Sequence, residues 1–186
     1  MRTMIPVGQL STDQLDRLRE DIEFDLMTKA KKARPQTGNW ICRQLLPWTD
    51  LALVGGPAAG VLTDFWGTQV LVASTALIYV NHQLQDDEFV GIYGLNIRDV
   101  NPSIIKVLFQ TGAAASTYGA INVEQMYGQL IPEIVTPEYY YYPGGSTVYV
   151  QVIPDAVGKA VGADGVADHL ILLGMMVKPA GEVLSL

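Results

Sequence analysis

The sequence is poor in the residues that cross-link a fold or carry metal chemistry. Its 186 residues include one cysteine, Cys42, and two histidines, His82 and His169. One cysteine can form neither an intrachain disulfide nor a paired-cysteine zinc site. The histidines lie far apart in the sequence, and neither belongs to an HxH or HExxH pattern. We therefore expect a protein that is not an enzyme, holds no cofactor or metal, and depends on an ordinary hydrophobic core.

Motifs for phosphate and calcium binding are missing as well. The stretch GGPAAG at residues 55–60 is followed by Val61 and Leu62, whereas a phosphate-binding loop continues with lysine and a hydroxyl residue. Three consecutive acids at residues 86–88 lack the spacing of a calcium loop. Both stretches are predicted to be turns or solvated loops. A cupin-type metalloenzyme is disfavoured too, because its metal needs two or three histidines that converge with a carboxylate.

Charge is scarce and unevenly placed. Charged residues make up 17% of the chain, the mean hydropathy is +0.20, and the net charge is −7. Residues 1–43 carry a net charge of +2, and residues 44–186 carry −9. An acidic body argues against specific nucleic-acid binding, which requires the neutralisation of phosphates. With few charges, much of the surface must be neutral, and neutral surface is typical of protein interfaces.

The first part of the sequence predicts an amphipathic helix. Ser11 and Gln14 have the spacing of a capping box, and apolar residues then recur every three or four positions up to Leu26. Pro35 and Gly38 end the pattern. We predict that residues 1–37 form an N-terminal arm on a domain of residues 38–186. The apolar stripe of the arm needs a cover, which we expect from a neighbouring subunit or the interior of an assembly; its candidate interface residues are Leu15, Leu18 and Ile22.

Basic residues gather at the end of this helix, at Lys29, Lys31, Lys32 and Arg34. They are too few for strong nucleic-acid binding by one chain. Repeated over many copies, they would form a basic inner face toward a genome or an anionic membrane. An ordinary basic helix end, which complements the helix dipole, is the alternative.

The body of the chain has no sustained helical period and predicts many short strands. Turn residues separate apolar or alternating runs near residues 39–46, 50–55, 68–80, 88–98, 103–110, 119–127, 130–135, 146–153 and 169–178. Strands this numerous and close together indicate an all-β sandwich or barrel. The charge-free run of residues 65–85 is long enough to span a membrane, but polar residues interrupt it and β-branched residues are frequent in it.

Four consecutive tyrosines, at residues 139–142, precede the turn Pro143-Gly144-Gly145. On a strand, two of them face each way. Tyrosine combines a large apolar area with a polar end, which suits protein interfaces and carbohydrate stacking. We therefore consider three roles for these residues: half core and half surface, a subunit interface, or a sugar-binding platform. The candidate interface residues are Tyr139, Tyr140, Tyr141 and Tyr142.

Four stretches together resemble a known family. They are EFVGIYGLNIRDVNPSIIKVLFQTG, INVEQMYGQL, VTPEYYYYPGGSTVYVQVIP and HLILLGMMVKPAG, which span residues 88–181. In strand order, chain size and turn placement they resemble the small major capsid proteins of sphaerolipovirus-like viruses, which are icosahedral and contain a membrane. The sequence departs from this family in its modest net charge of −7, since family members whose hosts live in near-saturated brine are expected to carry a larger acid excess.

The resemblance implies a single eight-stranded jelly roll that stands perpendicular to a viral shell. It implies a virion structural protein that forms homo-oligomers and hetero-oligomers with a second, larger capsid protein over an internal membrane. A phage decoration protein shares these features. The alternative function is a carbohydrate- or receptor-binding β-sandwich of the lectin or tail-fibre type, with its ligand near residues 139–142.

Overall fold

The computed structural model describes residues 4–36, 38–46, 50–51, 76–97, 104–111, 116–123, 126, 133–154 and 170–180. Most of the predicted strands at 50–55 and 68–80, the GGPAAG turn and His169 lie outside these residues.

The N-terminal helix α1 (Thr12–Ala33) begins and ends where the sequence predicts. The hydroxyl of Ser11 accepts a hydrogen bond from the Gln14 backbone N–H (3.3 Å), and the Gln14 side chain accepts one from the Ser11 N–H (2.9 Å). This reciprocal pair satisfies two of the free donors at the start of the helix. The short strand β1 (Ile5–Pro6) and the 3-10 turn η1 (Val7–Gln9) precede it.

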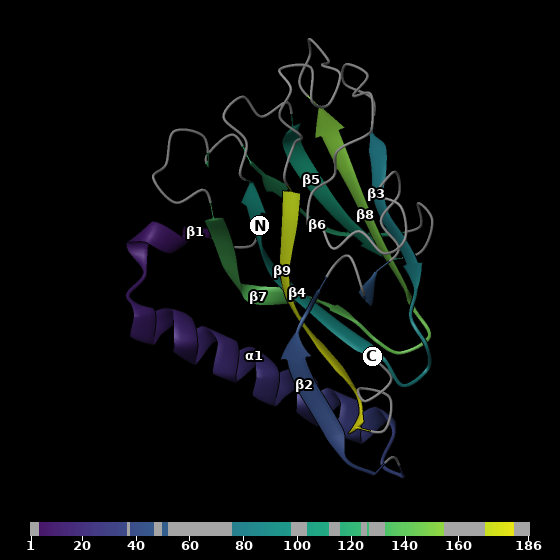
Figure 1. Ribbon diagram of the computed structural model, residues 1–186. Coiled ribbons are helices and arrows are strands. Elements are labelled where there is room, and N and C mark those ends of the chain that lie inside the picture. The colour runs from purple at the N-terminus through teal and green to yellow at the C-terminus, as the bar shows by residue number, and fades with distance from the viewer. Residues whose placement is uncertain are drawn as a thin grey trace.

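Eight further strands form the body, with helix α1 beside them (Figure 1). They are β2 (Trp40–Gln44), β3 (Leu77–Gln83), β4 (Phe89–Ile97), β5 (Ile104–Thr111), β6 (Ser116–Asn122), β7 (Glu133–Tyr142), β8 (Thr147–Pro154) and β9 (Leu170–Pro179). All pairings are antiparallel, in two sheets with the orders β1-β7-β4-β9-β2 and β3-β8-β5-β6. The expected all-β sandwich with an N-terminal helix is confirmed.

The pairing pattern defines the sandwich as a jelly roll. Strand β2 pairs with β9, β3 with β8, β4 with β7, and β5 with β6, so the pairs are nested along the chain. Folding such a set of nested pairs over itself produces two four-stranded sheets, which is the jelly-roll arrangement. Strand β1 adds a short ninth member beside β7.

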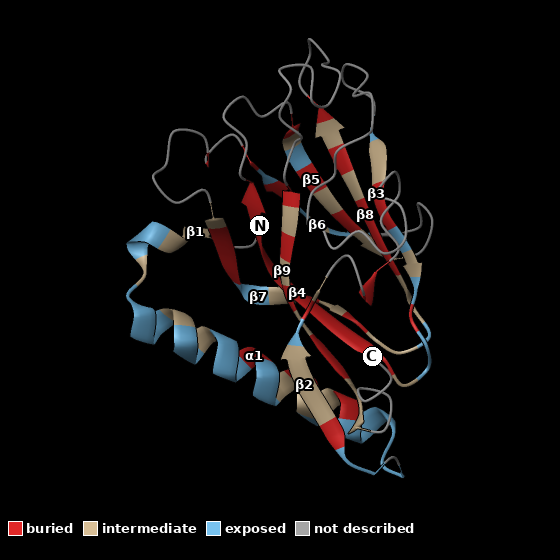
Figure 2. Cartoon of the chain, in the orientation of Figure 1, coloured by how far each residue is buried: buried red, intermediate tan, exposed pale blue. Residues whose placement is uncertain are grey.

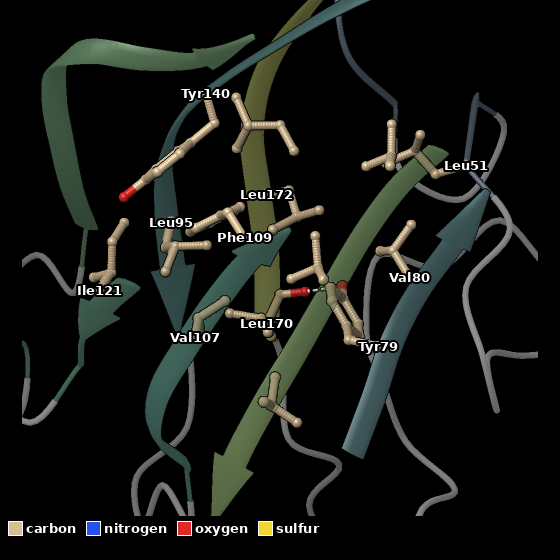
Figure 3. Close-up of a cluster of buried hydrophobic side chains, with 14 of the residues drawn as sticks. Leu51, Tyr79, Val80, Leu95, Val107, Phe109, Ile121, Tyr140, Leu170 and Leu172 are labelled. Carbon is tan, nitrogen blue, oxygen red and sulfur yellow. Dashed lines mark hydrogen bonds between the residues drawn. The ribbon is translucent and has the colours of Figure 1, made fainter. Parts of the chain in front are cut away.

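The core lies between the two sheets (Figure 3). The rings of Phe109 on β5 and Tyr140 on β7 stack across the sandwich, with centroids 4.1 Å apart and an interplanar angle of 14°. The hydroxyl of Tyr79 donates a hydrogen bond of 2.5 Å to the Leu170 carbonyl oxygen, which joins β3 to β9 (Figure 3). Apolar residues at alternate positions of both sheets bury against each other, so this interior holds the sheets together.

Strand β7 is longer than the sequence predicts. The predicted strand at 130–135 ends before Pro137, but the observed strand continues through this proline to Tyr142. The register of β7 against β4 shifts between Val135 and Tyr140, and Thr136 there donates its hydroxyl hydrogen to nearby carbonyl oxygens. Proline is tolerated at such an irregularity because no regular ladder hydrogen bond is lost.

Candidate assembly surface

Helix α1 covers the outer face of the sheet β1-β7-β4-β9-β2 (Figure 2). Leu26 and Ala30 pack in a cluster with Trp40, Phe89 and Val177 of the sheet. Ile22 packs in a second cluster with Tyr93 and Val135 and is 2% exposed. The helix thus removes from water an apolar sheet face that would otherwise be exposed.

A polar cluster fastens the helix to β7. The carboxylate oxygen Oδ2 of Asp25 accepts hydrogen bonds from the Lys29 ammonium (2.7 Å) and the Tyr139 hydroxyl (2.6 Å). The Lys29 nitrogen also lies 4.8 Å from the ring centroid of Tyr139 and 4.9 Å from that of Tyr141. These contacts combine a charged hydrogen bond with cation–π attraction.

The cluster shifts the pKa values of its members. Hydrogen bonds from Lys29 and then Tyr139 hold the pKa of Asp25 below its usual 3.8. Burial raises the pKa of Tyr139 above its ordinary value, and its hydrogen bond to Asp25 adds to the effect. Burial also raises the pKa of the Cys42 thiol on neighbouring β2 to about 12. Cys42 packs beside the helix cluster, so its thiol is poorly reactive while the helix is docked.

The candidate interface residues of the helix lie against the chain's own sheet. Leu15 and Leu18 are half-buried next to the Ile22 cluster. The sheet therefore supplies the cover that the sequence led us to expect from a neighbour. The assignment of these residues to a subunit interface stays a prediction, and it requires the helix to leave the sheet.

The four tyrosines alternate between the two faces of β7. Tyr140 and Tyr142 are buried in the core, and Tyr139 and Tyr141 lie under helix α1. Two of the four tyrosines therefore lie in the core, and helix α1 covers the other two. The four rings do not share one face, and both the interface role and the sugar-binding role stay predictions.

The basic residues of the helix separate into two settings. Lys29 belongs to the polar cluster with Asp25, whereas Lys31, Lys32 and Arg34 are exposed. Arg34 forms a salt bridge of 3.0 Å with Asp86. The inner-face role proposed for them stays a prediction.

The outer face of the other sheet, which we call the bare face, carries almost no charge among the residues that the structure describes. Alternate residues of β3, β8, β5 and β6 point into the core, so their neighbours point outward. Lys106 is the one charged side chain among these outward residues, which are Ile78, Asn81, Gln83, Lys106, Leu108, Gln110, Ala120, Asn122, Thr147, Tyr149, Gln151 and Ile153. Most of them are exposed or half-buried.

This face was not among the sites that the sequence predicted. Its signal was present: residues 147–153, TVYVQVI, alternate buried valines with uncharged outward side chains. The sequence did not show that the outward residues of four strands lie on one surface.

The described part of the chain contains no candidate cluster of metal ligands and no candidate membrane-spanning helix. Within it, no group of three or more histidine, cysteine, aspartate or glutamate side chains could hold a metal ion. In the same residues, no helix has the length and apolar character needed to cross a membrane.

Strand order defines the described part of the chain as a jelly-roll β-sandwich with helix α1 over one of its two sheets. No family model and no curated protein sequence matches it. Among solved structures it is similar to VP17, a capsid protein of bacteriophage P23-77, with 8% sequence identity. The similarity covers 77% of this chain and 98% of VP17, with a TM-score of 0.44. A likeness of this size carries no argument about function.

Proposed function

We propose that this chain is a virion structural protein, a capsid subunit that assembles with copies of itself. The observation that carries the proposal is the bare face, a sheet surface whose described residues include one charged side chain, in a protein of net charge −7. Jelly rolls of this kind occur in viral capsids, lectins and cupins, so the fold alone leaves the function open.

Electrostatics support contact through the bare face. Two copies that each carry −7 repel one another, and any contact that buries carboxylates adds a desolvation cost. A face of leucine, isoleucine, tyrosine and amide side chains avoids both costs. Charged residues are depleted at the centre of protein interfaces, and tyrosine is enriched there.

The finer proposal comes from the family resemblance. In it, the shell is icosahedral, contains a second, larger capsid protein and encloses a lipid membrane, and residues 1–37 act as an arm of the subunit. Chain size and the nested strand pairs are consistent with this role. Weak contacts would suffice, because a closed symmetric shell repeats each contact many times.

The proposal is tested by assembly of purified protein. Light scattering and negative-stain imaging at raised salt and concentration should reveal regular particles, sheets or rings. Leu108→Glu places a carboxylate beside Gln151 at the middle of the bare face and should abolish these assemblies. Gln36→Glu adds the same charge at an exposed turn beyond helix α1 and should assemble normally.

Two outcomes contradict the proposal. Equal assembly of Leu108→Glu and the unchanged chain rules out the bare face as the contact. A protein that stays monomeric at all concentrations, alone and with candidate shell partners, rules out the capsid role.

A further inference from the structure

Helix α1 has a second face, which points away from the sheet that it covers (Figure 2). The buried residues Ile22, Leu26 and Ala30 face the sheet. Successive residues of an α-helix are rotated by about 100°, so a second line of residues runs along the opposite side. We call this line the outward stripe. Its members are all exposed, and they are Asp13, Arg17, Glu20, Phe24, Thr28 and Lys31.

Phe24 stands near the middle of the outward stripe. The helix runs from Thr12 to Ala33, and Phe24, at 76%, is the most exposed large apolar side chain of the described residues. One turn later, the Thr28 hydroxyl donates a hydrogen bond of 2.8 Å to the Phe24 carbonyl oxygen. Since this donor is satisfied within the helix, burial of Thr28 would leave no unmatched hydroxyl hydrogen. The centre of the stripe thus offers an aromatic ring beside a satisfied polar group.

The charges on the two sides of Phe24 have opposite signs. Before it, the exposed charged residues of the helix are five acids and two arginines, which sum to −3: Asp13, Asp16, Arg17, Arg19, Glu20, Asp21 and Glu23. After it, the exposed charged residues of the helix are Lys31 and Lys32, which sum to +2. A second copy of this helix, turned end for end, places its positive end beside the negative end of the first.

We propose that the outward stripe binds the same stripe of a second copy of this chain, in an antiparallel contact centred near Phe24. Each Phe24 ring packs on the stripe of the other copy, and each Glu20 lies near the partner's Lys31. A two-fold contact makes both interactions twice. It goes beyond the proposed function, because helix α1 and the bare face belong to different sheets of the sandwich and the two contacts are independent. A subunit that makes both contacts links two neighbours, as an extended array requires.

A second copy fits the stripe better than an anionic membrane does. A membrane surface would also accept Phe24 and the two lysines. However, Glu20, Asp21 and Glu23 lie within one turn of Phe24, and their carboxylates would be repelled by lipid phosphates. The same carboxylates are attracted by the basic end of a second helix.

The first test measures dimerisation by sedimentation equilibrium. It uses the full chain with Leu108→Glu, which is designed to suppress assembly through the bare face. We expect an equilibrium between monomer and dimer. Adding Phe24→Ala should raise the dimer dissociation constant about tenfold, because the central aromatic contact is lost from both copies. Tyr118→Ala removes another exposed aromatic side chain, 40% exposed on β6, and should leave the dissociation constant unchanged.

A charge exchange tests the antiparallel arrangement. Glu20→Lys and Lys31→Glu should each weaken the dimer about tenfold, since each places like charges side by side. The double variant with both substitutions should restore dimerisation. The two positions are eleven residues apart on one helix, which is a distance of about 16 Å. Restoration therefore requires a contact between copies.

Each outcome separates this contact from the capsid role. Equal dimerisation with and without Phe24→Ala overturns the helix contact, as does a double variant that stays as weak as the single ones. A Leu108→Glu chain that is monomeric at all concentrations overturns it too, even where the unchanged chain forms particles. If Leu108→Glu still forms larger assemblies, Phe24→Ala must reduce them for the contact to stand. A Phe24-dependent dimer that never forms larger assemblies contradicts the capsid role and leaves the helix contact standing. Phe24-dependent binding to phosphatidylglycerol vesicles without a dimer would identify a membrane surface instead.

Discussion

The two sheets of this protein are built alike on the inside and differently on the outside. Both contribute alternate apolar residues to one core. The outer face of β1-β7-β4-β9-β2 carries large apolar side chains such as Phe89 and Val177, and the chain covers it with its own helix. The described residues of the bare face are amides, threonine and apolar side chains such as Leu108 and Ile153, with one charged side chain, Lys106. Among the described residues, the comparison shows a helix over the first outer face and no helix over the second.

The largest expected effect comes from a substitution in the core between the two sheets. Phe109→Ala deletes the ring that stacks on Tyr140 between the sheets and should lower the free energy of unfolding by about 3–5 kcal/mol. The matched control is Phe24→Ala on the outer side of helix α1, where the side chain is 76% exposed. It should change the stability by less than about 0.5 kcal/mol. Urea denaturation of both variants checks this, and equal losses would contradict the assigned core.

The next largest effect comes from a substitution that loosens the contact between helix α1 and the sheet it covers. Leu26→Ala removes a fully buried contact between helix α1 and the sheet and should cost about 2–4 kcal/mol. Because Cys42 packs in the same cluster, its thiol should react faster with a disulfide reagent at pH 8 in this variant. Unchanged thiol reactivity in a destabilised variant would mean that the helix does not protect Cys42.

A smaller effect concerns pH and the polar cluster. The folded pKa of Asp25 lies below its unfolded value of 3.8, so ionised Asp25 stabilises the docked helix above that pH. This contribution is lost as the pH falls through the lowered folded pKa. Tyr139→Phe removes one donor and should cost about 0.5–1 kcal/mol at neutral pH, since the cluster is partly exposed. The difference in stability between the variant and the unchanged chain should shrink as the pH falls below 3.8, as measured by thermal unfolding. A difference independent of pH would point to lost packing instead.

The smallest effect belongs to the bare face. Leu108→Ala removes a half-buried side chain that faces outward, and it should reduce stability by less than about 1 kcal/mol. Leu26→Ala is the matched substitution on the covered side. The Leu108 variant should instead lower the tendency to assemble, which light scattering measures. A loss of stability as large as that of Leu26→Ala would mean that the bare face is not open.

Local patterns predicted the helix and most of the strands. The capping box of Ser11 and Gln14 involves neighbouring residues, so it could be read directly from the sequence. The length of β7 could not, because Pro137 indicates a strand end unless the partner strand has an irregular register there. The candidate residues of the helix were correctly seen as an apolar stripe, but the sequence did not reveal the surface that covers them.

The sequence by itself determined the periodicity of each segment, the alternation of the tyrosines, and an acidic body with much neutral surface. These properties depend on residues close together in the chain. The tertiary structure alone decided that helix α1 covers one sheet, that the Tyr140 ring packs against Gly119, and that Lys106 is the one charged side chain among the described outward residues of the other sheet. Each of these depends on which strands become neighbours, and the nested pairing brings together residues more than a hundred positions apart, such as Trp40 and Pro179.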